Sequence, residues 1–186
     1  NKLYSFNTVK KDWLFGYLSY DLKNEIEDLK SSNEDNFRFD NLFFFIPEYV
    51  LLLRGKNLEI HTFNTKIQTD YFISSFKYDD FLEEHNYIDF QKRDKKSAYL
   101  SKISKIKAHI QRGDIYEMNY CQDFYAENVL INPNKVFYEL NTIMRTPFAS
   151  FLKLNDHYVL SCSPERFLRK NGNQILSQPI KGTRKR

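Results

Sequence analysis

Short strand-like segments joined by turn residues dominate this chain, and they restrict it to folds built on antiparallel sheets. From Phe148 to Gln178 the apolar residues alternate as they do in strands. Turns are expected at Asn155-Asp156 and at Asn171-Gly172, and Asn-Gly between two strand patterns favours a type I′ hairpin. The sequence therefore predicts strands at residues 148–154, 157–162, 166–170 and 173–178.

The first half of the chain is also rich in strand patterns. Trp13 to Tyr20 and Leu42 to Ile46 are predicted as buried strands, because both runs are dominated by aromatic and aliphatic residues. Residues 49–53 and 58–63 predict a hairpin around Gly55-Lys56-Asn57. A short helix is expected around Thr69 to Phe76.

Two amphipathic helices interrupt this pattern in the second half. The first is predicted from Ser97 to Arg112, where apolar residues recur at helical spacing and Gly113 supplies a left-handed stop. The second follows Asn132 as N-cap and Pro133 at the first helical position. We expect both to pack on a sheet. Strands grouped with strands predict an α+β fold, with a sheet-rich part at residues 1–90 and a second part at residues 91–186.

Composition excludes several classes of protein. The 186 residues are 41% hydrophobic and 28% charged, as in folded soluble proteins, and no apolar run approaches the length of a membrane span. Cys121 and Cys162 form neither a disulfide framework nor a metal cluster, and no secretion signal opens the chain, so a reduced cytoplasmic setting is expected. No membrane partner is expected.

Charge is distributed unevenly along the chain. Residues 1–90 carry 10 Lys and Arg against 16 Asp and Glu, and residues 91–186 carry 18 against 8. A solvated basic helix face explains much of this, and an anionic metabolite or a nucleic acid is the alternative. The basic residues are spread over several elements without a stacking motif for bases, so no nucleic acid is expected as a partner.

Two segments carry residues suited to acid–base and nucleophilic chemistry. Glu165 stands in Ser163-Pro-Glu-Arg-Phe167, after a proline that cannot donate to a β-ladder, so we expect it at a strand break that opens to a cleft. Lys181 stands in Gln178-Pro-Ile-Lys-Gly-Thr183, and the intervening hairpin can return it beside Glu165. The following Arg184-Lys-Arg186 run would disfavour protonation of Lys181, as a nucleophile requires. On residue type alone, each is more often a solvated surface charge.

A third segment of interest follows the first predicted helix. Gly113-Asp-Ile-Tyr-Glu-Met-Asn-Tyr120 predicts a strand with Ile115, Glu117 and Asn119 on one face. A strand with one wet face is the plainer interpretation of those polar positions.

These segments resemble motifs of the chorismate-utilising enzymes, which include anthranilate synthase component I, aminodeoxychorismate synthase component I and the isochorismate synthases. The resemblance is strong from Gly113 to Arg184 and weaker at residues 13–18 and 43–48. Glu117 stands where glutamine is common in the family. The implied fold is a two-layer antiparallel β-sandwich flanked by helices, incomplete in this chain because family members are more than twice as long.

The resemblance also implies an activity. Lysine at position 181 is typical of aminodeoxychorismate synthases, whereas anthranilate synthases carry alanine there. By this resemblance Lys181 attacks C2 of chorismate as the C4 hydroxyl leaves, Glu165 serves as acid and then base, and ammonia displaces the lysine to give 4-amino-4-deoxychorismate for para-aminobenzoate and folate synthesis. Gly182 and Thr183 are expected to contact the substrate.

Further expectations follow from the same resemblance. Mg²⁺ is the implied cofactor, with no ligand in this chain, and a glutamine amidotransferase subunit is the implied source of ammonia. Pro147, Phe148, Ala149 and Ser150 resemble a segment that lines a tryptophan pocket distant from the chemistry, and a simple strand entry is the alternative.

Other functions stay open. Anthranilate synthase and isochorismate or salicylate synthase are the alternatives within the family, and a non-catalytic ligand-binding or interaction module is the alternative outside it. We expect the isolated 186 residues to be inactive and to aggregate, since a sheet lacking half its strands leaves apolar faces uncovered.

Overall fold

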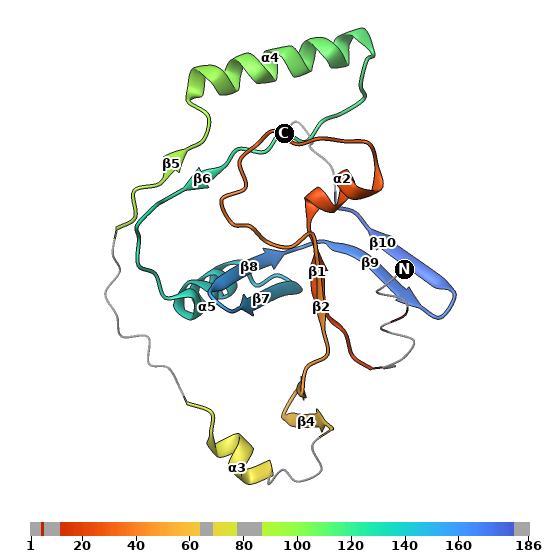
Figure 1. The fold of residues 1–186 in the computed structure, drawn as a ribbon, viewed down its shortest axis with the longest axis vertical. Helices are drawn as coiled ribbons and strands as arrows, with labels where there is room; N and C mark the ends of the chain where they lie inside the picture. Colours follow the sequence, from red (N-terminus) through yellow and green to blue (C-terminus); the bar gives the residue numbers. More distant parts are fainter. Residues whose placement is uncertain (1–4, 6–11, 64–68, 78–86, 181–186) are drawn as a thin grey trace. The chain divides into compact units, whose positions relative to one another are not determined.

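The computed structural model describes residues 5, 12–63, 69–77 and 87–180. Its contacts separate the chain into two units, Asn1–Asp79 and Asp80–Arg186, and each is described by itself. Figure 1 shows the order of the elements along the chain. Among the described residues, no helix is long and apolar enough to span a membrane.

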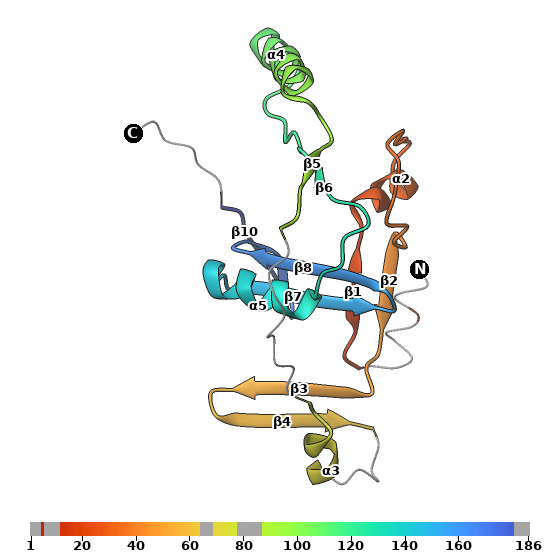
Figure 2. The same ribbon diagram turned by 90° about the vertical axis from the view of Figure 1, so that its left-hand side faces the viewer.

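The first unit contains two antiparallel strand pairs. β1 (Phe15–Leu18) pairs with β2 (Leu42–Phe45), and β3 (Tyr49–Arg54) pairs with β4 (Asn57–Thr62) through a turn at Gly55, whose φ is +60°. Figure 2 shows β3 and β4 side by side. A side chain at Gly16 would collide with the Phe43 carbonyl, so glycine permits the close approach of β1 to β2.

Short helices complete this unit. η1 (Tyr20–Leu22) and α2 (Lys23–Ile26) lie between β1 and β2 in the sequence, and α3 (Thr69–Ser74) follows β4. α3 is held against β3, because the Phe72 ring stacks on Tyr49 with centroids 4.4 Å apart. The predicted hairpin and the predicted short helix are therefore confirmed.

The prediction that β1 and β2 are buried is wrong for the part of the chain that the structure describes. Both strands are exposed or half-buried, and Val50, at 8% exposure, is the one described apolar residue that is buried. The physical reason is that each strand pair has apolar side chains without a second layer of described residues to cover them.

The second unit holds the longer helices and three more antiparallel pairs. Its elements are β5 (Gln91–Lys92), α4 (Lys96–Arg112), β6 (Phe124–Tyr125), α5 (Pro133–Met144), β7 (Phe148–Leu154), β8 (His157–Ser163), β9 (Arg166–Asn171) and β10 (Gln174–Gln178). β5 pairs with β6, β7 with β8, and β9 with β10.

Both helices are bounded as their sequences predict. α4 ends at Gly113, with φ +80°, where the Gly113 and Asp114 amides donate to the Ile110 and His109 carbonyls. The Asn132 side chain caps α5 by accepting hydrogen bonds from the Asn134 and Lys135 amides at 3.0 and 3.2 Å.

α5 packs on a sheet, as expected. It contacts β8 (Figure 2), and its Phe137 ring meets Phe151 of β7 edge-on at 5.5 Å. The described contacts of α4 include an ion pair between Lys102 and Asp94, which precedes the helix. Others are with the segment that returns from its end toward β6 (Figure 1), where the Tyr99 and Tyr120 rings lie 5.6 Å apart.

Two details of the predicted strands are wrong. Residues 114–120 form no strand, because this segment finds no ladder partner among the described residues and is attached to α4 by side chains instead. The β9–β10 turn is not type I′. Asn171 pairs with Gln174, so the loop is Gly172-Asn173, and of these only Gly172 has positive φ, at +56°, which fits a type II′ turn.

The fold is therefore a mixture of helices with antiparallel strand pairs, as an α+β class requires. The described strands form five separate two-stranded sheets. The two-layer sandwich stays a prediction, and so does a boundary near residue 90.

Candidate functional site

Glu165 occupies the two-residue break between β8 and β9. Its amide donates to Ser163 Oγ at 3.2 Å, and Ser163 Oγ donates to the Glu165 carbonyl at 3.0 Å. A short hydroxyl turn of this kind fixes the backbone without a ladder, as the intervening Pro164 requires. As a residue, Glu165 is half-buried.

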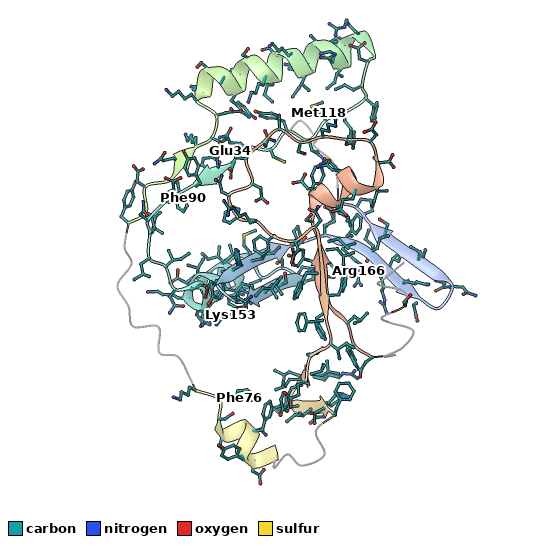
Figure 3. All side chains as sticks on the ribbon, viewed as in Figure 1. Glu34, Phe76, Phe90, Met118, Lys153 and Arg166 are labelled. Atoms are coloured by element: carbon teal, nitrogen blue, oxygen red, sulfur yellow. The ribbon has the colours of Figure 1, made fainter. Side chains whose placement is uncertain are left out.

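Arg166, labelled in Figure 3, begins β9 and contacts an aromatic ring. Its guanidinium carbon lies 4.8 Å from the centroid of the Phe148 ring. Its Nε is buried and has no hydrogen-bond partner among the described residues. None of the ion pairs between described residues includes Arg166. Within the described part of the chain, the arginine next to Glu165 therefore contacts an aromatic ring and no carboxylate.

The β9–β10 hairpin returns the chain to this position. Gln178, the last residue of β10, pairs with Arg166 across a register shift between Leu176 and Gln178. Ser177 Oγ donates to the Phe167 carbonyl at 3.3 Å, which ties the two strands together next to that shift. The hairpin therefore brings the residue three positions before Lys181 beside the residue that follows Glu165.

Lys181, Gly182 and Thr183 lie outside the described residues. The roles predicted for them as nucleophile and substrate contacts stay predictions.

The segment predicted to line a tryptophan pocket begins β7. Phe148 pairs with Ser163, Ala149 with Cys162, and Ser150 with Ser161. Pro147 and Ser150 are exposed, while Phe148 and Ala149 are half-buried. Phe148 lies opposite Ser163, two positions before Glu165, so this end of the segment is close to the predicted acid. The tryptophan pocket and its separation from the chemistry stay predictions.

A second polar cluster lies beside α4, and sequence reasoning did not find it. Lys102 Nζ donates to both carboxylate oxygens of Asp94 at 2.8 Å, and the Tyr120 hydroxyl donates to the same carboxylate. The hydrogen bond from Lys102, and then that from Tyr120, lowers the pKa of Asp94, and the bond to Asp94 raises the pKa of Lys102. The three residues are 8 to 26 positions apart in the sequence, so no local sequence pattern predicts the cluster.

A hollow of about 310 Å³ adjoins this cluster. Lys92, Asp94, Lys96, Tyr99, Gln122 and Phe124 line it. Asp94 also appears in the cluster, and Gln122 Nε2 donates to the carbonyls of Asp94 and Asp123. These contacts tie β5, α4 and the chain before β6 to one another.

The polar residues after α4 are partly accounted for by helix capping. Asp114 accepts hydrogen bonds from Arg112 Nη2 at 2.7 Å and Arg112 Nε at 3.1 Å, and its carboxylate lies 2.7 Å from His109 Nδ1. Because the Asp114 carboxylate binds two side chains of the last turn of α4, it fixes the direction in which the chain leaves the helix. Asp114 is thus committed to a structural role.

The described residues hold no cluster of three or more His, Cys, Asp or Glu side chains that could bind a metal ion. The Mg²⁺ cofactor and the absence of its ligands from this chain stay predictions.

Comparison with known proteins identifies relatives over the whole chain. A family model described as chorismate binding enzyme matches residues 2–186. The chain is 35% identical over 95 residues to aminodeoxychorismate synthase component 1 of Escherichia coli (strain K12), a match that covers 51% of this chain and 21% of the relative. It is 28% identical to an anthranilate synthase component I-like protein of Synechocystis, covering 94% of this chain and 37% of the relative.

A solved structure has the same fold. The crystal structure of anthranilate synthase component I from Streptococcus pneumoniae TIGR4 superimposes with a TM-score of 0.67 at 19% identity, and the match covers 87% of this chain and 40% of that one. The chain spans less than half the length of these relatives. The match covers 21% of the Escherichia coli protein and 37% of the Synechocystis protein. It covers 42% of a further relative, anthranilate synthase component 1 of Saccharolobus solfataricus.

Proposed function

Because the chain belongs to the chorismate-binding enzyme family, we propose that its complete gene product aminates chorismate at C4 and yields 4-amino-4-deoxychorismate. The observation that carries this proposal is the register of the β9–β10 hairpin. Gln178 pairs with Arg166, so the strand that leads to Lys181 ends beside the residue that follows Glu165. The family resemblance assigns these two residues the roles of nucleophile and acid.

The proposed chemistry divides one displacement into two covalent steps. The neutral Lys181 amine forms a bond to C2 of chorismate, the two ring double bonds shift, and the C4 hydroxyl leaves as water with a proton from Glu165. Ammonia then adds at C4, the two double bonds shift back, and the bond from C2 to the lysine nitrogen breaks. The ionised Glu165 takes a proton from the added nitrogen and is restored as the acid. Two lower barriers replace one high barrier, which is the usual advantage of a protein nucleophile.

The backbone around Glu165 supports its part in this scheme. A general acid must be held within reach of the group to which it gives its proton. Ser163 fixes the backbone on one side of Glu165, and the pairing of Arg166 with Gln178 fixes it on the other. The carboxyl group is therefore carried by backbone that is held at both ends.

Further parts of the proposal rest on the family. We include a two-layer sandwich completed by strands beyond the described pairs, a glutamine amidotransferase partner that supplies ammonia, and Mg²⁺ bound by residues outside this chain. Relatives of this chain are named as component 1 of synthases, which supports a partner subunit. No step of the mechanism is derived through the metal.

Anthranilate synthesis is the second candidate. Relatives named anthranilate synthase match this chain at 27 to 28% identity over almost its whole length. The lysine at position 181 favours the first candidate.

Product identification tests the proposal. The complete gene product is incubated with chorismate, Mg²⁺ and ammonium at alkaline pH, and the product is identified by liquid chromatography with mass spectrometry. We expect 4-amino-4-deoxychorismate. Anthranilate or isochorismate would retain the family and overturn the lysine argument, and unconsumed chorismate would favour a non-catalytic binding module.

A further inference from the structure

The arginine beside Glu165 is the strongest feature that the proposed mechanism does not use. Arginine and glutamate are consecutive, so a guanidinium released from its present contact has a carboxylate within reach of its flexible side chain. Instead, the Arg166 guanidinium lies over the Phe148 ring with 4.8 Å between its central carbon and the ring centroid. Such cation–π contacts stabilise by about 0.5 to 2 kcal/mol, depending on how far they are desolvated.

The backbone places Phe148 where it can hold this side chain. Phe148 pairs with Ser163 across β7 and β8, and Ser163 begins the turn that leads to Arg166. The ring is half-buried, and so is Arg166, whose Nε is shielded from solvent. The contact is therefore built from the strand register and is not a chance meeting of two exposed side chains.

We propose that Phe148 is a positioning residue for the proposed acid Glu165, and that it acts by holding the Arg166 guanidinium on its ring and away from the glutamate carboxylate. This inference rests on the proposed function, because it assumes that Glu165 delivers a proton. An arginine paired with a carboxyl group favours the ionised form, which has no proton to give. The aromatic face engages the arginine without contributing a negative charge of its own.

The test uses the complete gene product and compares pH profiles of chorismate amination. Glu165→Gln first identifies the limb of the kcat/KM profile that depends on Glu165. Phe148→Leu frees Arg166, and we expect that limb to move to lower pH by about one unit, the lower end of the effect of a neighbouring opposite charge. In the double variant Phe148→Leu with Arg166→Met the limb returns to its wild-type position, because no cation is left to pair with Glu165.

Two further variants separate positioning from general packing. Phe151→Leu shortens another half-buried ring of β7, one that contacts Phe137 of α5, and its limb stays at the wild-type pH. Arg166→Met alone also leaves the limb in place, whatever rate remains, and this variant tests the inference even if Phe148→Leu does not fold.

Three outcomes contradict the inference. A Phe148→Leu limb at the wild-type pH shows that the ring does not restrain the arginine. A shift that persists in the double variant has a cause other than Arg166. A limb that moves to higher pH in Arg166→Met alone shows that the arginine already pairs with Glu165. If one of these outcomes occurs and Glu165→Gln aminates chorismate more slowly, the inference fails but the proposed function stands. If Glu165→Gln aminates chorismate at the wild-type rate, the proposed function itself is overturned.

Discussion

At the scale of single residues, the charged side chains of the second unit contact residues that are distant in the sequence. Sequence identified Glu165 and its arginine neighbour, but it could not show that Arg166 contacts a phenylalanine 18 positions earlier in the chain. The same limit applies to Asp94, whose partners Lys102 and Tyr120 come from α4 and from the segment that returns along it. Contacts set by tertiary structure leave no local pattern.

The Asp94 cluster predicts a pH-dependent contribution to stability. The pKa of Asp94 is lowered from 3.8, so its contribution is present above that pH and is lost as pH falls through the lower folded-state value. The pKa of Lys102 is raised from 10.5, so its contribution is present below that pH and is lost as pH rises through the higher folded-state value. Both contributions of the cluster to stability are therefore fully present between pH 3.8 and pH 10.5.

We expect Asp94→Asn in the complete gene product to lower Tm at pH 7, and the difference from wild type to close below pH 3.8. Differential scanning fluorimetry over a pH series measures this. Asp21→Asn is the matched control: the Asp21 carboxylate also pairs with a lysine, but that Lys23 is only two positions away. Asp21 also accepts a hydrogen bond from Ser31, ten positions away, whereas Asp94 joins segments 26 positions apart through Tyr120. Loss of the Asp21 carboxylate releases a shorter loop, so a smaller loss of Tm is expected. Equal losses for the two variants would contradict the structural role of the Asp94 cluster.

At the scale of elements, local signals predicted what local forces determine. The caps of α4 and α5 and the β3–β4 and β7–β8 hairpins were predicted, because each depends on residues adjacent in sequence. The predicted strand at residues 114–120 failed, since a strand requires a partner that the segment itself does not contain. The loop between β9 and β10 lies one residue later than predicted, because Gly172 occupies its first position and not its second.

This hairpin yields a prediction, because it carries the chain back to Arg166. Gly172 has φ +56° and open space around it, so Gly172→Ala adds left-handed strain of about 1 kcal/mol without a clash. We expect a lower Tm and a lower kcat/KM for chorismate, since the strained turn loosens the register that precedes Lys181. Gly55→Ala provides the control: Gly55 has φ +60°, equally open surroundings and a place in the β3–β4 hairpin, which carries none of the proposed site residues. It should lower Tm alike and leave kcat/KM unchanged. A similar effect of both variants on kcat/KM would contradict the role of the β9–β10 register.

At the scale of the whole molecule, ordered motifs revealed the family more readily than they revealed the packing. The blocks at Gly113–Tyr120, Ser163–Phe167 and Gln178–Thr183 indicated the family of chorismate-utilising enzymes, and the family match over residues 2–186 confirms this membership. The burial of β1 and β2 was mispredicted because hydrophobic composition shows what a strand can bury but not which layer covers it. Large apolar side chains such as Leu53 (72% exposed) and Phe167 (84% exposed) are left uncovered by the described residues. This exposure is why we expect the isolated 186 residues to aggregate.

The measurement that tests the central claim most directly compares the complete gene product with its Lys181→Ala variant. Both are incubated with chorismate, Mg²⁺ and ammonium, and the rate and identity of the products are determined by liquid chromatography with mass spectrometry. The circular dichroism spectrum of each protein verifies that the variant is folded. If Lys181 attacks C2, the wild type forms 4-amino-4-deoxychorismate and the folded variant aminates chorismate more slowly or yields a different product. An unchanged rate and an unchanged product in the variant would show that the reaction does not proceed through the lysine.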